Sequence, residues 1–558
     1  MKRIVSYLFL LVFVPGVSCR NAEPDKNNVS GIPTRENEDE KQSGVSLFID
    51  SLGIAEFFTH YGLGENYLEN ARIFYRKRNN AFAWIDNSGV NEYGRNFMNL
   101  LNSEERLSGG GCVLFKERLF YLYNKATAGA YDIRTDASVA ELELLLTVNF
   151  FDYASRNWHG ISDEELKKVG WFIERKNMKY EELLDTVLKN DPRNMSAYEP
   201  VMRQYGLLRN FLRKYREIEE GGGRRQWSLH SASLRKGDTS ALLPDIRNQL
   251  YLLGDLAVND SSTLFDGGLE AAVKRFEKRH GLSEKGIIAG ETLRALQVPL
   301  HERIQQLLIN IERSRWVPAG RQGDYLVVNI PAFKLLVYHN DNLQWSCNVI
   351  VGKSEAANNT VIFNDDLKYI VFSPYWNIPE NILTRETLPE IKKDLHYLST
   401  HDMEVVDDKG HIIDPANIDW ELYTSHFPYT IRQCPGKNNA LGLVKFLFPN
   451  SYDIYMHDTP EKSLFNETTR TFSHGCIRVE EPYKLAAYLL RDDTAMTAGK
   501  MNELLYGGKE TFVRLKNKVP VFIAYFTAWV DMEGRLNFRD DVYHHDAKMK
   551  QLMFSDKN

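Results

Sequence analysis

The spacing of the apolar residues changes once along the chain, and this change limits the possible folds more than any other feature. Before Asp324 the apolar residues recur every three or four positions, as in the stripe Ala140, Leu144 and Val148. From Asp324 onward, β-branched and aromatic runs separated by turn residues take over, as in 326–330. The sequence therefore predicts an α+β protein in which helical regions precede a mixed β-sheet domain.

Turn-forming and charged stretches divide the chain further. The run Gly221-Gly222-Gly223 marks a break, and a length of 558 residues allows three or four domains. The predicted segments are an export signal (1–19), a flexible tether (20–44), a helical scaffold (45–230, completed by 300–320), a three-helix module (231–299), a sheet domain (321–535) and a C-terminal tail (536–558). An insertion in the sheet domain, at about 376–445, is long enough to form a lid.

Local signals place elements within these segments. In the module, Pro244 opens one helix that Gly254 ends, a second helix covers 269–280, and a turn at Gly290 opens a third. The predicted strands of the sheet domain are 326–330, 334–338, 347–351, 369–372 and 521–526, and a helix at 482–491 is expected to pack on them.

The first residues have the layout of an export signal. Lys2 and Arg3 precede an apolar run, 4–14, that is too short to span a membrane as a helix. Cys19 follows small residues at the expected cleavage point, which resembles a bacterial lipoprotein signal and makes Cys19 the candidate lipidation site. The alternative is a plain secretory signal with an incidental cysteine. The polar stretch after Cys19 predicts a tether from a membrane to its surroundings.

Charge and cysteine content exclude some classes of function. A formal net charge of -6 gives no basic excess to meet phosphates, so we expect no nucleic-acid partner. Membrane contact is expected only through a lipid anchor. Cys112, Cys347 and Cys434 show no disulfide spacing and are interpreted as packed residues. We expect no cofactor.

The segment 454–479 carries the residues best suited to chemistry. Alternation along 452–457 places Tyr455 and His457 on the same side of a strand. The chain returns at 473–476, and such a return can bring the Cys476 thiol beside an imidazole, a base that can activate it. Gly475 lets the backbone approach a substrate closely, so the amides near the sulfur are candidates to face an oxyanion.

Two other interpretations of the same residues stay open at this point. A lone cysteine and a lone histidine in apolar surroundings are often packed core residues. A zinc site formed by His457, His474 and Cys476 lacks a fourth ligand nearby, so we expect no metal.

The segment His457–Arg478, which ends in Ser-His-Gly-Cys-Ile-Arg, resembles the signature of the L,D-transpeptidases, cysteine enzymes with a YkuD-type catalytic domain that remodel peptidoglycan. The resemblance extends upstream to Asn439-Ala440-Leu441-Gly442, Val444-Lys445-Phe446, Phe448-Pro449-Asn450 and Tyr375-Trp376-Asn377-Ile378-Pro379. Together these segments resemble the large, multidomain branch of the family.

Two further segments resemble other parts of that branch. Residues 74–84 resemble its N-terminal scaffold region, and Phe276 with 279–282 resembles the small three-helix peptidoglycan-binding domain. A spacer without ligand is the alternative for the module. The resemblance also implies that the insertion is a substrate-capping subdomain that includes Trp376 and 429–435.

The resemblance implies an acyl transfer. The Cys476 thiolate attacks the carbonyl of the third residue of a stem tetrapeptide, D-alanine leaves, and an amine of a second stem takes the acyl group to form a 3-3 cross-link. His457 is the implied base, the amides of Gly475 and Cys476 with the Tyr455 hydroxyl hold the oxyanion, and Ser473 and His474 fix the His457 tautomer. The candidate substrate-binding residues are Arg478, Trp376, Lys445, Arg432 and Asn439.

The same resemblance implies partners and a location. The partners are donor and acceptor stem peptides of peptidoglycan, with carbapenem-type β-lactams as inhibitors. The expected location is the periplasm or cell envelope, with lipid anchoring, in cell wall biogenesis and the control of cell shape. The alternatives are an L,D-carboxypeptidase, in which water resolves the thioester, and a non-catalytic wall-binding lipoprotein.

Overall fold

The computed structural model describes residues 34–35, 47–108, 111–129, 136–173, 179–191, 203–222, 233–317, 322–423 and 426–554. The predicted export signal with Cys19 lies outside these residues, as does the predicted tether apart from 34–35. Among the described helices, none combines the length and apolar character that a membrane span requires. The chain forms two compact units, Met1–Ala154 with Lys179–Tyr198, and Ser155–Met178 with Glu199–Asn558.

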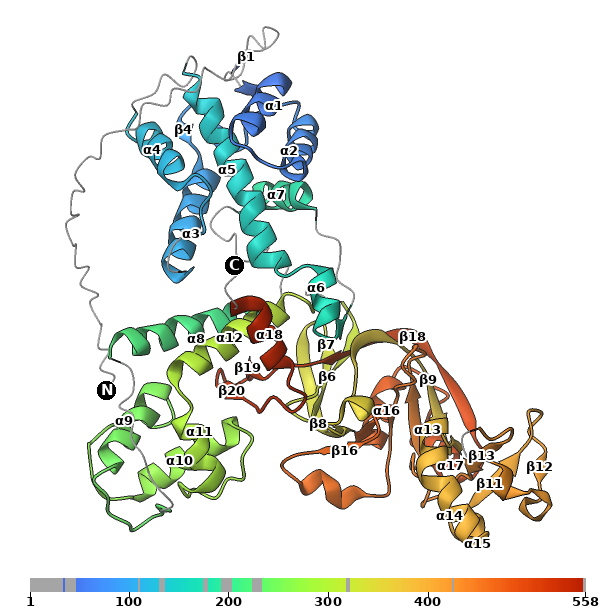
Figure 1. Ribbon diagram of the computed structural model, residues 1–558. Coiled ribbons are helices and arrows are strands. Elements are labelled where there is room, and N and C mark those ends of the chain that lie inside the picture. Colours follow the sequence, from blue (N-terminus) through green and yellow to red (C-terminus); the bar gives the residue numbers. More distant parts are fainter. Residues whose placement is uncertain are drawn as a thin grey trace, which may run out of the picture. The chain divides into compact units, whose positions relative to one another are not determined.

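The first unit is helical and is built around one buried helix. Its helices are α1 (Ser51–His60), α2 (Glu65–Lys77), α3 (Glu92–Ser108), α4 (Lys116–Thr127), α5 (Ser138–Ala154) and α7 (Tyr180–Lys189), with short strand pairs β1 (Thr34–Arg35) with β2 (Phe48–Ile49) and β3 (Ile85–Asp86) with β4 (Gly89–Val90). Nearly every residue of α5 is buried, and the other helices pack around it (Figure 1). Burial raises the pKa of its Glu143 to about 7, while the amides of Ala83 and Trp84 donate to the same carboxyl group.

The second unit begins with η1 (Ser155–His159), α6 (Asp163–Lys168) and β5 (Trp171–Phe172), and continues with α8 (Arg203–Glu220) and α12 (Leu300–Ser314), which pack on each other. Between these two helices lies the module of α9 (Leu243–Leu253), α10 (Gly267–Arg279) and α11 (Gly290–Gln297), which has a hydrophobic core of its own. The predicted helix signals are confirmed, because Pro244 lies in the first turn of α9 and Gly254 ends it with a φ of 90°.

The large sheet of this unit carries the candidate site. Its order is β14 (Val444–Leu447), β15 (Met456–His457), β17 (Ile477–Val479), β8 (Asn342–Gly352), β7 (Lys334–His339), β6 (Asp324–Asn329), β18 (Thr511–Ala524), β9 (Ile362–Phe372) and β5, and β16 (Thr471–Ser473) pairs with β8. Because β14 also pairs with β9, the strands from β14 to β9 close into a ring. The core inside includes Met456 and Ile477, and α16 (Pro482–Leu489) and α17 (Ala498–Tyr506) pack against it. The predicted α+β class is confirmed.

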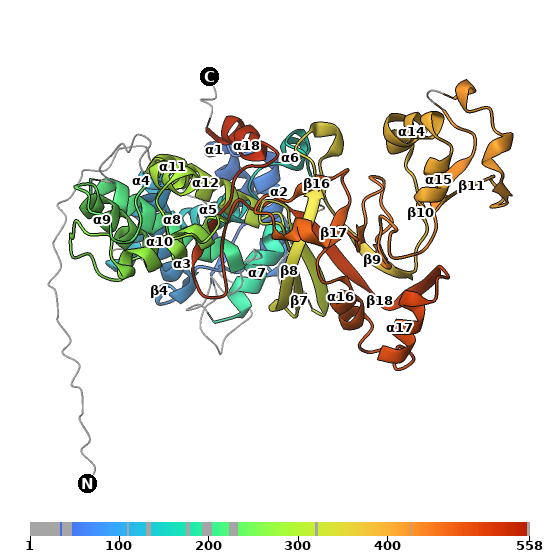
Figure 2. The same ribbon diagram turned by 90° about the horizontal axis from the view of Figure 1, so that it is seen from below.

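The predicted insertion forms a separate small lobe, here called the cap (Figure 2). Its strands, in the order β10 (Trp376–Asn377), β13 (Thr430–Gln433), β11 (Met403–Val406) and β12 (Ile412–Ile413), form a second sheet. The segments α13 (Glu380–Ile382), η4 (Leu383–Thr387), α14 (Leu388–Lys393), α15 (His396–Thr400), η5 (Pro415–Asn417) and η6 (Trp420–Leu422) accompany it. The cap has its own hydrophobic core, which includes Val405 and Ile431. It is therefore a small folded body rather than a loop.

Two sequence expectations are wrong. The strand expected over 452–457 is reduced to β15, because Asp453 adopts a φ of 54° and turns the chain just before it.

The expected tail contains β20 (Leu536–Phe538), which pairs with β19 (Ala528–Val530), and α18 (His545–Phe554). The Asp546 carboxylate of α18 is buried, where it pairs with Arg313 and accepts from the Thr527 hydroxyl at 2.7 Å. The helix α18 is thus part of the core.

We predict that Asp546→Asn destabilises the second unit by about 3 kcal/mol, because it leaves the buried Arg313 guanidinium without its counter-charge. The matched control is Glu503→Gln, which breaks the exposed Lys500–Glu503 pair and is expected to cost less than about 1 kcal/mol. Chemical denaturation of the full chain measures both. Equal losses for the two variants would contradict a structural role for the end of the chain.

Candidate active site

The pairing of β15 with β17 brings the predicted site residues together. The two strands are parallel, with Met456 beside Ile477 and His457 beside Arg478. Tyr455 and Cys476 precede these pairs, and the Ile477 amide donates to the Tyr455 carbonyl at 3.0 Å. Side chains alternate across a strand, so the buried Met456 and Ile477 enter the core. The opposite face carries Tyr455, His457, Cys476 and Arg478. The thiol and the imidazole are therefore diagonal neighbours on one face.

The Cys476 thiol is held by groups close to it in the fold. Its Sγ donates to the Asp453 carbonyl at 3.6 Å. The Tyr455 hydroxyl lies near the sulfur and favours the thiolate. Burial raises the pKa of the Cys476 thiol, against the opposing effects of Tyr455 and the Lys445 charge. Within the described ranges no hydrogen bond joins this thiol to the His457 ring. The resting thiol is thus protonated and turned toward Asp453.

The His457 ring is buried in one defined tautomer. Its Nδ1 lies within hydrogen-bonding distance of the Asp458 carbonyl, which can only accept, so Nδ1 carries the proton and Nε2 has a free lone pair. Burial, followed by the charges of Arg478 and Lys445, lowers the pKa of His457 to about 3. The ring is therefore a neutral base at physiological pH. The expectation that Ser473 and His474 fix the tautomer is wrong, because the Asp458 carbonyl does so.

Asp458 is a supporting residue that the sequence reading missed. Its buried carboxylate accepts from the Leu443 amide at 3.0 Å, the Lys462 ammonium at 2.6 Å and the Tyr483 hydroxyl at 2.9 Å. Gly442 makes this possible, because a Cβ at that position would lie 2.3 Å from the carboxylate and its φ is 60°. The sequence did carry a signal for this residue. Asp458 directly follows His457, and Gly442 belongs to the upstream segment 439–442 that resembles the family. Asp458 fixes the chain where β15 ends, and thereby the carbonyl that orients His457.

The turn before the nucleophile is fixed by side-chain hydroxyls. Gly475 has a φ of 119°, and its carbonyl accepts from the Thr360 hydroxyl at 2.7 Å. The Ser473 hydroxyl donates to the Cys476 carbonyl at 2.5 Å and accepts from the Gly475 amide at 3.2 Å. The Gly475 amide, expected at the oxyanion, is thus engaged within the turn. The Cys476 amide makes no hydrogen bond within the part of the chain that the structure describes.

Two cations lie on the same face of the sheet. Lys445 is the β14 partner of His457, and its Nζ lies 3.8 Å from the centre of the Tyr455 ring. Burial lowers the pKa of Lys445, while the nearby Cys476 opposes that shift. Arg478 forms an ion pair with Glu461, whereas Lys445 has no carboxylate within 4 Å among the described residues. Lys445 is therefore the cation that faces the thiol without a counter-ion.

The cap contributes side chains to this face. The Trp376 indole lies near the Tyr455 hydroxyl and opposes the burial that raises the pKa of Tyr455. The His474 Nε2 lies 2.9 Å from the Glu386 carboxylate of η4, which joins the cap to the turn that precedes the nucleophile. Glu386 had no recognisable signal in the sequence. Because His474 faces the cap, it does not point with His457 and Cys476 toward one centre. The described residues contain no cluster of three or more metal-ligating side chains.

Two candidate substrate-binding residues are engaged elsewhere. Arg432 pairs with Glu404 within the cap, and its guanidinium lies 4.1 Å from the centre of the Tyr375 ring. Asn439 is 1% exposed, and its amide group donates to the carbonyls of Pro374, Gln433 and Cys434. The expectation that Asn439 contacts substrate is wrong, because this buried side chain is used to hold the turn between β13 and β14.

We predict that Glu386→Gln loosens the cap by removing the charge that faces His474. Amide hydrogen exchange in 380–400 should become up to about fivefold faster, since partly exposed pairs of this kind contribute at most ~1 kcal/mol. The matched control is Glu390→Gln, which removes a carboxylate of α14 that pairs with Lys393 on the same helix. Identical exchange in the two variants would contradict a role for the Glu386–His474 contact in holding the cap.

Parts of the sequence match known protein families. Residues 323–521 match the family described as "L,D-transpeptidase catalytic domain", residues 69–212 match "Scaffold domain", and residues 240–296 match "Putative peptidoglycan binding domain". A Haemophilus influenzae protein described as "Putative L,D-transpeptidase" is 37% identical over 245 residues, which cover 44% of this chain and 49% of the relative. The chain thus spans about half the length of that curated relative.

Solved structures of L,D-transpeptidases also align with the chain. The protein from Xylanimonas cellulosilytica is 12% identical and covers 53% of this chain and 100% of its own, with a TM-score of 0.16. The protein from Stackebrandtia nassauensis is 12% identical and covers 53% of this chain and 97% of its own, with a TM-score of 0.20. With scores this low, the assignment rests on the sequence matches. Residues 323–521 of this chain are an L,D-transpeptidase catalytic domain of the YkuD family.

Proposed function

We propose that the chain is a peptidoglycan L,D-transpeptidase in which Cys476 is the nucleophile. One observation carries the proposal: the parallel register of β15 and β17 sets Cys476 beside Tyr455 and diagonal to His457 on one face. The family matches of the catalytic domain and of the module support peptidoglycan as the substrate. The cap contacts the same face through Trp376 and Glu386, which suits a site that encloses part of a long polymer.

In the first step the sulfur leaves the Asp453 carbonyl, turns toward Nε2 of His457 and attacks the carbonyl of the third residue of a donor stem. The thiol proton passes to Nε2 as the carbon–sulfur bond forms. The oxyanion accepts from the Cys476 amide and the Tyr455 hydroxyl, and one such donor is worth on the order of 3 kcal/mol. When the peptide bond breaks, Nε2 returns the proton to the departing amine of D-alanine, and a thioester remains.

In the second step an amine of an acceptor stem attacks the thioester carbonyl. His457 takes a proton from the attacking amine and passes it to the sulfur as the carbon–sulfur bond breaks. The products are a 3-3 cross-link and the free thiol. The same groups thus serve both halves of the reaction, with His457 alternating between base and acid.

The cations have different roles in this scheme. Lys445 lies next to the sulfur without a counter-ion, so its charge stabilises the negative charge that develops there. Arg478 is already paired with Glu461, and its charge lowers the pKa of His457, which keeps the ring neutral at rest. Trp376 lies near the Tyr455 hydroxyl, so its indole N–H helps to orient that group. Arg432, bound within the cap, supports the segment that carries Trp376.

We also propose that the protein acts in the cell envelope, held to a membrane by lipid on Cys19. The peptidoglycan-related domains support the location, and the lipoprotein-like pattern of the sequence supports the anchor. A tether between Cys19 and the first unit would let the catalytic domain reach the wall.

The protonation states predict a flat pH profile for acylation. His457 is neutral above its pKa of about 3, and burial holds the Cys476 pKa above its usual range, so neither group changes charge near neutral pH. The second-order rate of carbapenem acylation should vary less than about twofold between roughly pH 5.5 and 7.5. Stopped-flow absorbance measures this rate. A tenfold fall over the same interval would show that the base titrates there, contrary to the structure.

The proposed reaction is tested by intact mass and by product analysis. We expect a carbapenem adduct on the full chain, loss of that adduct in Cys476→Ser, and its retention in the matched control Cys434→Ser, whose partly buried thiol lies in the cap. With disaccharide tetrapeptides as substrate, the unsubstituted chain should release D-alanine and form 3-3 dimers, and Cys476→Ser should do neither.

The possible results separate the proposal from its alternatives. Release of D-alanine with tripeptides as the main product would instead assign a carboxypeptidase. An adduct that persists in Cys476→Ser, or folded protein that forms none, would refute Cys476 as the nucleophile.

A further inference from the structure

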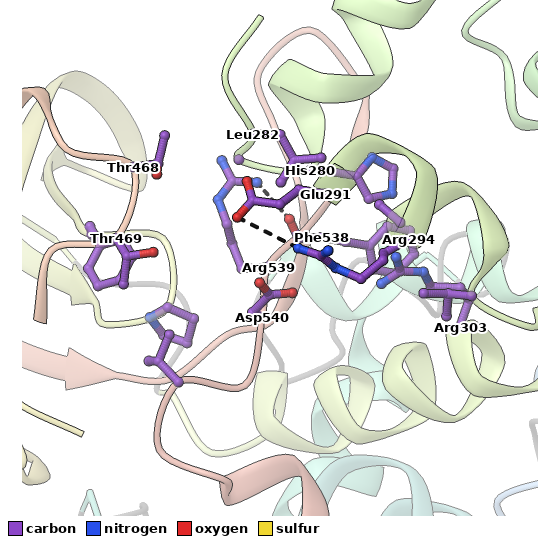
Figure 3. A pocket seen from close by; sticks show the side chains of 16 residues that line it. His280, Leu282, Glu291, Arg294, Arg303, Thr468, Thr469, Phe538, Arg539 and Asp540 are labelled. Carbon is purple, nitrogen blue, oxygen red and sulfur yellow. Dashed lines mark hydrogen bonds and ion pairs between the residues drawn. The ribbon is translucent and has the colours of Figure 1, made fainter. Parts of the chain in front are cut away.

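A cavity lies away from the nucleophile, between the three-helix module and the sheet domain. It has a volume of about 350 Å³, within the range of small-molecule sites. Three arginines line it: Arg294 of α11, Arg303 of α12 and Arg539, which follows β20. Figure 3 shows Thr468 and Thr469 on one side of the cavity, Arg294 and Arg303 on the other, and Arg539 between them.

Arg539 is a positioned cation rather than a solvated one. Its guanidinium donates to the carbonyls of Arg279 at 3.0 Å and Phe538 at 2.6 Å. It packs directly over Gly281, where a Cβ would lie 2.5 Å from its Nε. Burial, helped by the charge of Arg470, lowers the pKa of Arg539 to about 10. Among the described residues no carboxylate lies within 4 Å of it, so its charge is only partly compensated.

The remaining charges around the cavity leave a positive excess. Arg303 lies 4.6 Å from the centre of the Phe538 ring, which fixes its guanidinium at the wall. Arg294 reaches Glu291 only at 3.9 Å and is 72% exposed, so it can turn toward a ligand. Glu291 and Asp540 are the acids of the lining, and burial keeps His280 neutral by lowering its pKa. The lining thus holds three arginines and two acids, and Arg303 also donates to the Gln306 side chain at 2.8 Å.

We propose that this cavity binds a carboxylate group of a peptidoglycan strand, at a site separate from the donor stem in the active site. Guanidinium groups bind carboxylates through paired hydrogen bonds, and the hydroxyls of Thr468 and Thr469 suit the amide and hydroxyl groups beside such a carboxylate. The stem peptides of peptidoglycan carry free carboxylates at intervals along the glycan. The identity of the polymer rests on the proposed function.

The cavity is connected in sequence to the active site. Thr468 and Thr469 are separated from β16 by Arg470, and β16 leads into the turn that carries Cys476. A strand held at the cavity therefore contacts the same stretch of chain that ends at the nucleophile. Holding the polymer at a second point raises the local concentration of stems near the cap without any new contact at the reacting atoms.

The test is retention on purified peptidoglycan sacculi by co-sedimentation, with the full chain in a Cys476→Ser background to exclude acylation. We expect Arg294→Gln and Arg539→Gln each to weaken retention by about fivefold or more, as for loss of a charged hydrogen bond. The matched control is Arg235→Gln, an exposed arginine of the same module outside the cavity, which should bind as the parent does. Because the Arg294 side chain is exposed, its variant is not expected to unfold.

Chemical treatment of the sacculi identifies the ligand group. Coupling the carboxylates to a neutral amine should reduce retention of the parent to that of the arginine variants, while removal of phosphodiester-linked polymers with hydrofluoric acid should leave it unchanged. Full retention of both arginine variants, full binding to the amide-capped sacculi, or loss only after hydrofluoric acid would each overturn the proposal.

The outcome is independent of the test of the proposed function. Carbapenem adduct formation without arginine-dependent retention overturns the cavity proposal and leaves the catalytic one standing. Arginine-dependent retention without any adduct on the Cys476-containing chain supports the cavity and refutes the catalytic proposal.

Discussion

The hydrogen-bonded register between β15 and β17 is the constraint on which the site depends. The paired stretch is short: Met456 lies beside Ile477, and His457 lies beside Arg478. A slip of one residue would send His457 into the core and Met456 to the surface, because side chains alternate along a strand. The burial of Met456 and Ile477 in the apolar core opposes such a slip. Hydrophobic packing on one face of the sheet therefore sets the catalytic geometry on the other.

The electrostatics of the site favour an uncharged resting pair. Burial acts in opposite directions on the two groups, since it raises the pKa of the Cys476 thiol and lowers that of His457 to about 3. A preformed thiolate–imidazolium pair is therefore unfavourable. Proton transfer is expected to accompany the attack on the substrate, when the Lys445 charge and the oxyanion donors become useful. Such a resting thiol is also less prone to oxidation than a thiolate.

Much of this arrangement could be predicted from the sequence, because it depends on local signals. The helices of the module follow from Pro244 and Gly254, and the strands from β-branched runs. The contacts that tune the site join residues far apart in the chain, and so they could not be read from local patterns. The Asp458 carbonyl that orients His457, the Glu386 carboxylate that faces His474, and the burial of Asn439 all depend on how separate segments meet. The C-terminal helix was missed because only one of its two buried residues, Met549, is apolar, and the other is a charged aspartate whose partner Arg313 lies in α12.

The position of β18 has a consequence for when the nucleophile becomes active. β18 pairs in parallel with β6, with Val521 beside Leu326, and also lies against β9. The ring of strands therefore cannot close until β18, which lies late in the sequence, has been synthesised. Folding dominated by such distant pairings is slow, so the sheet that positions Cys476 is completed only after most of the chain has been synthesised.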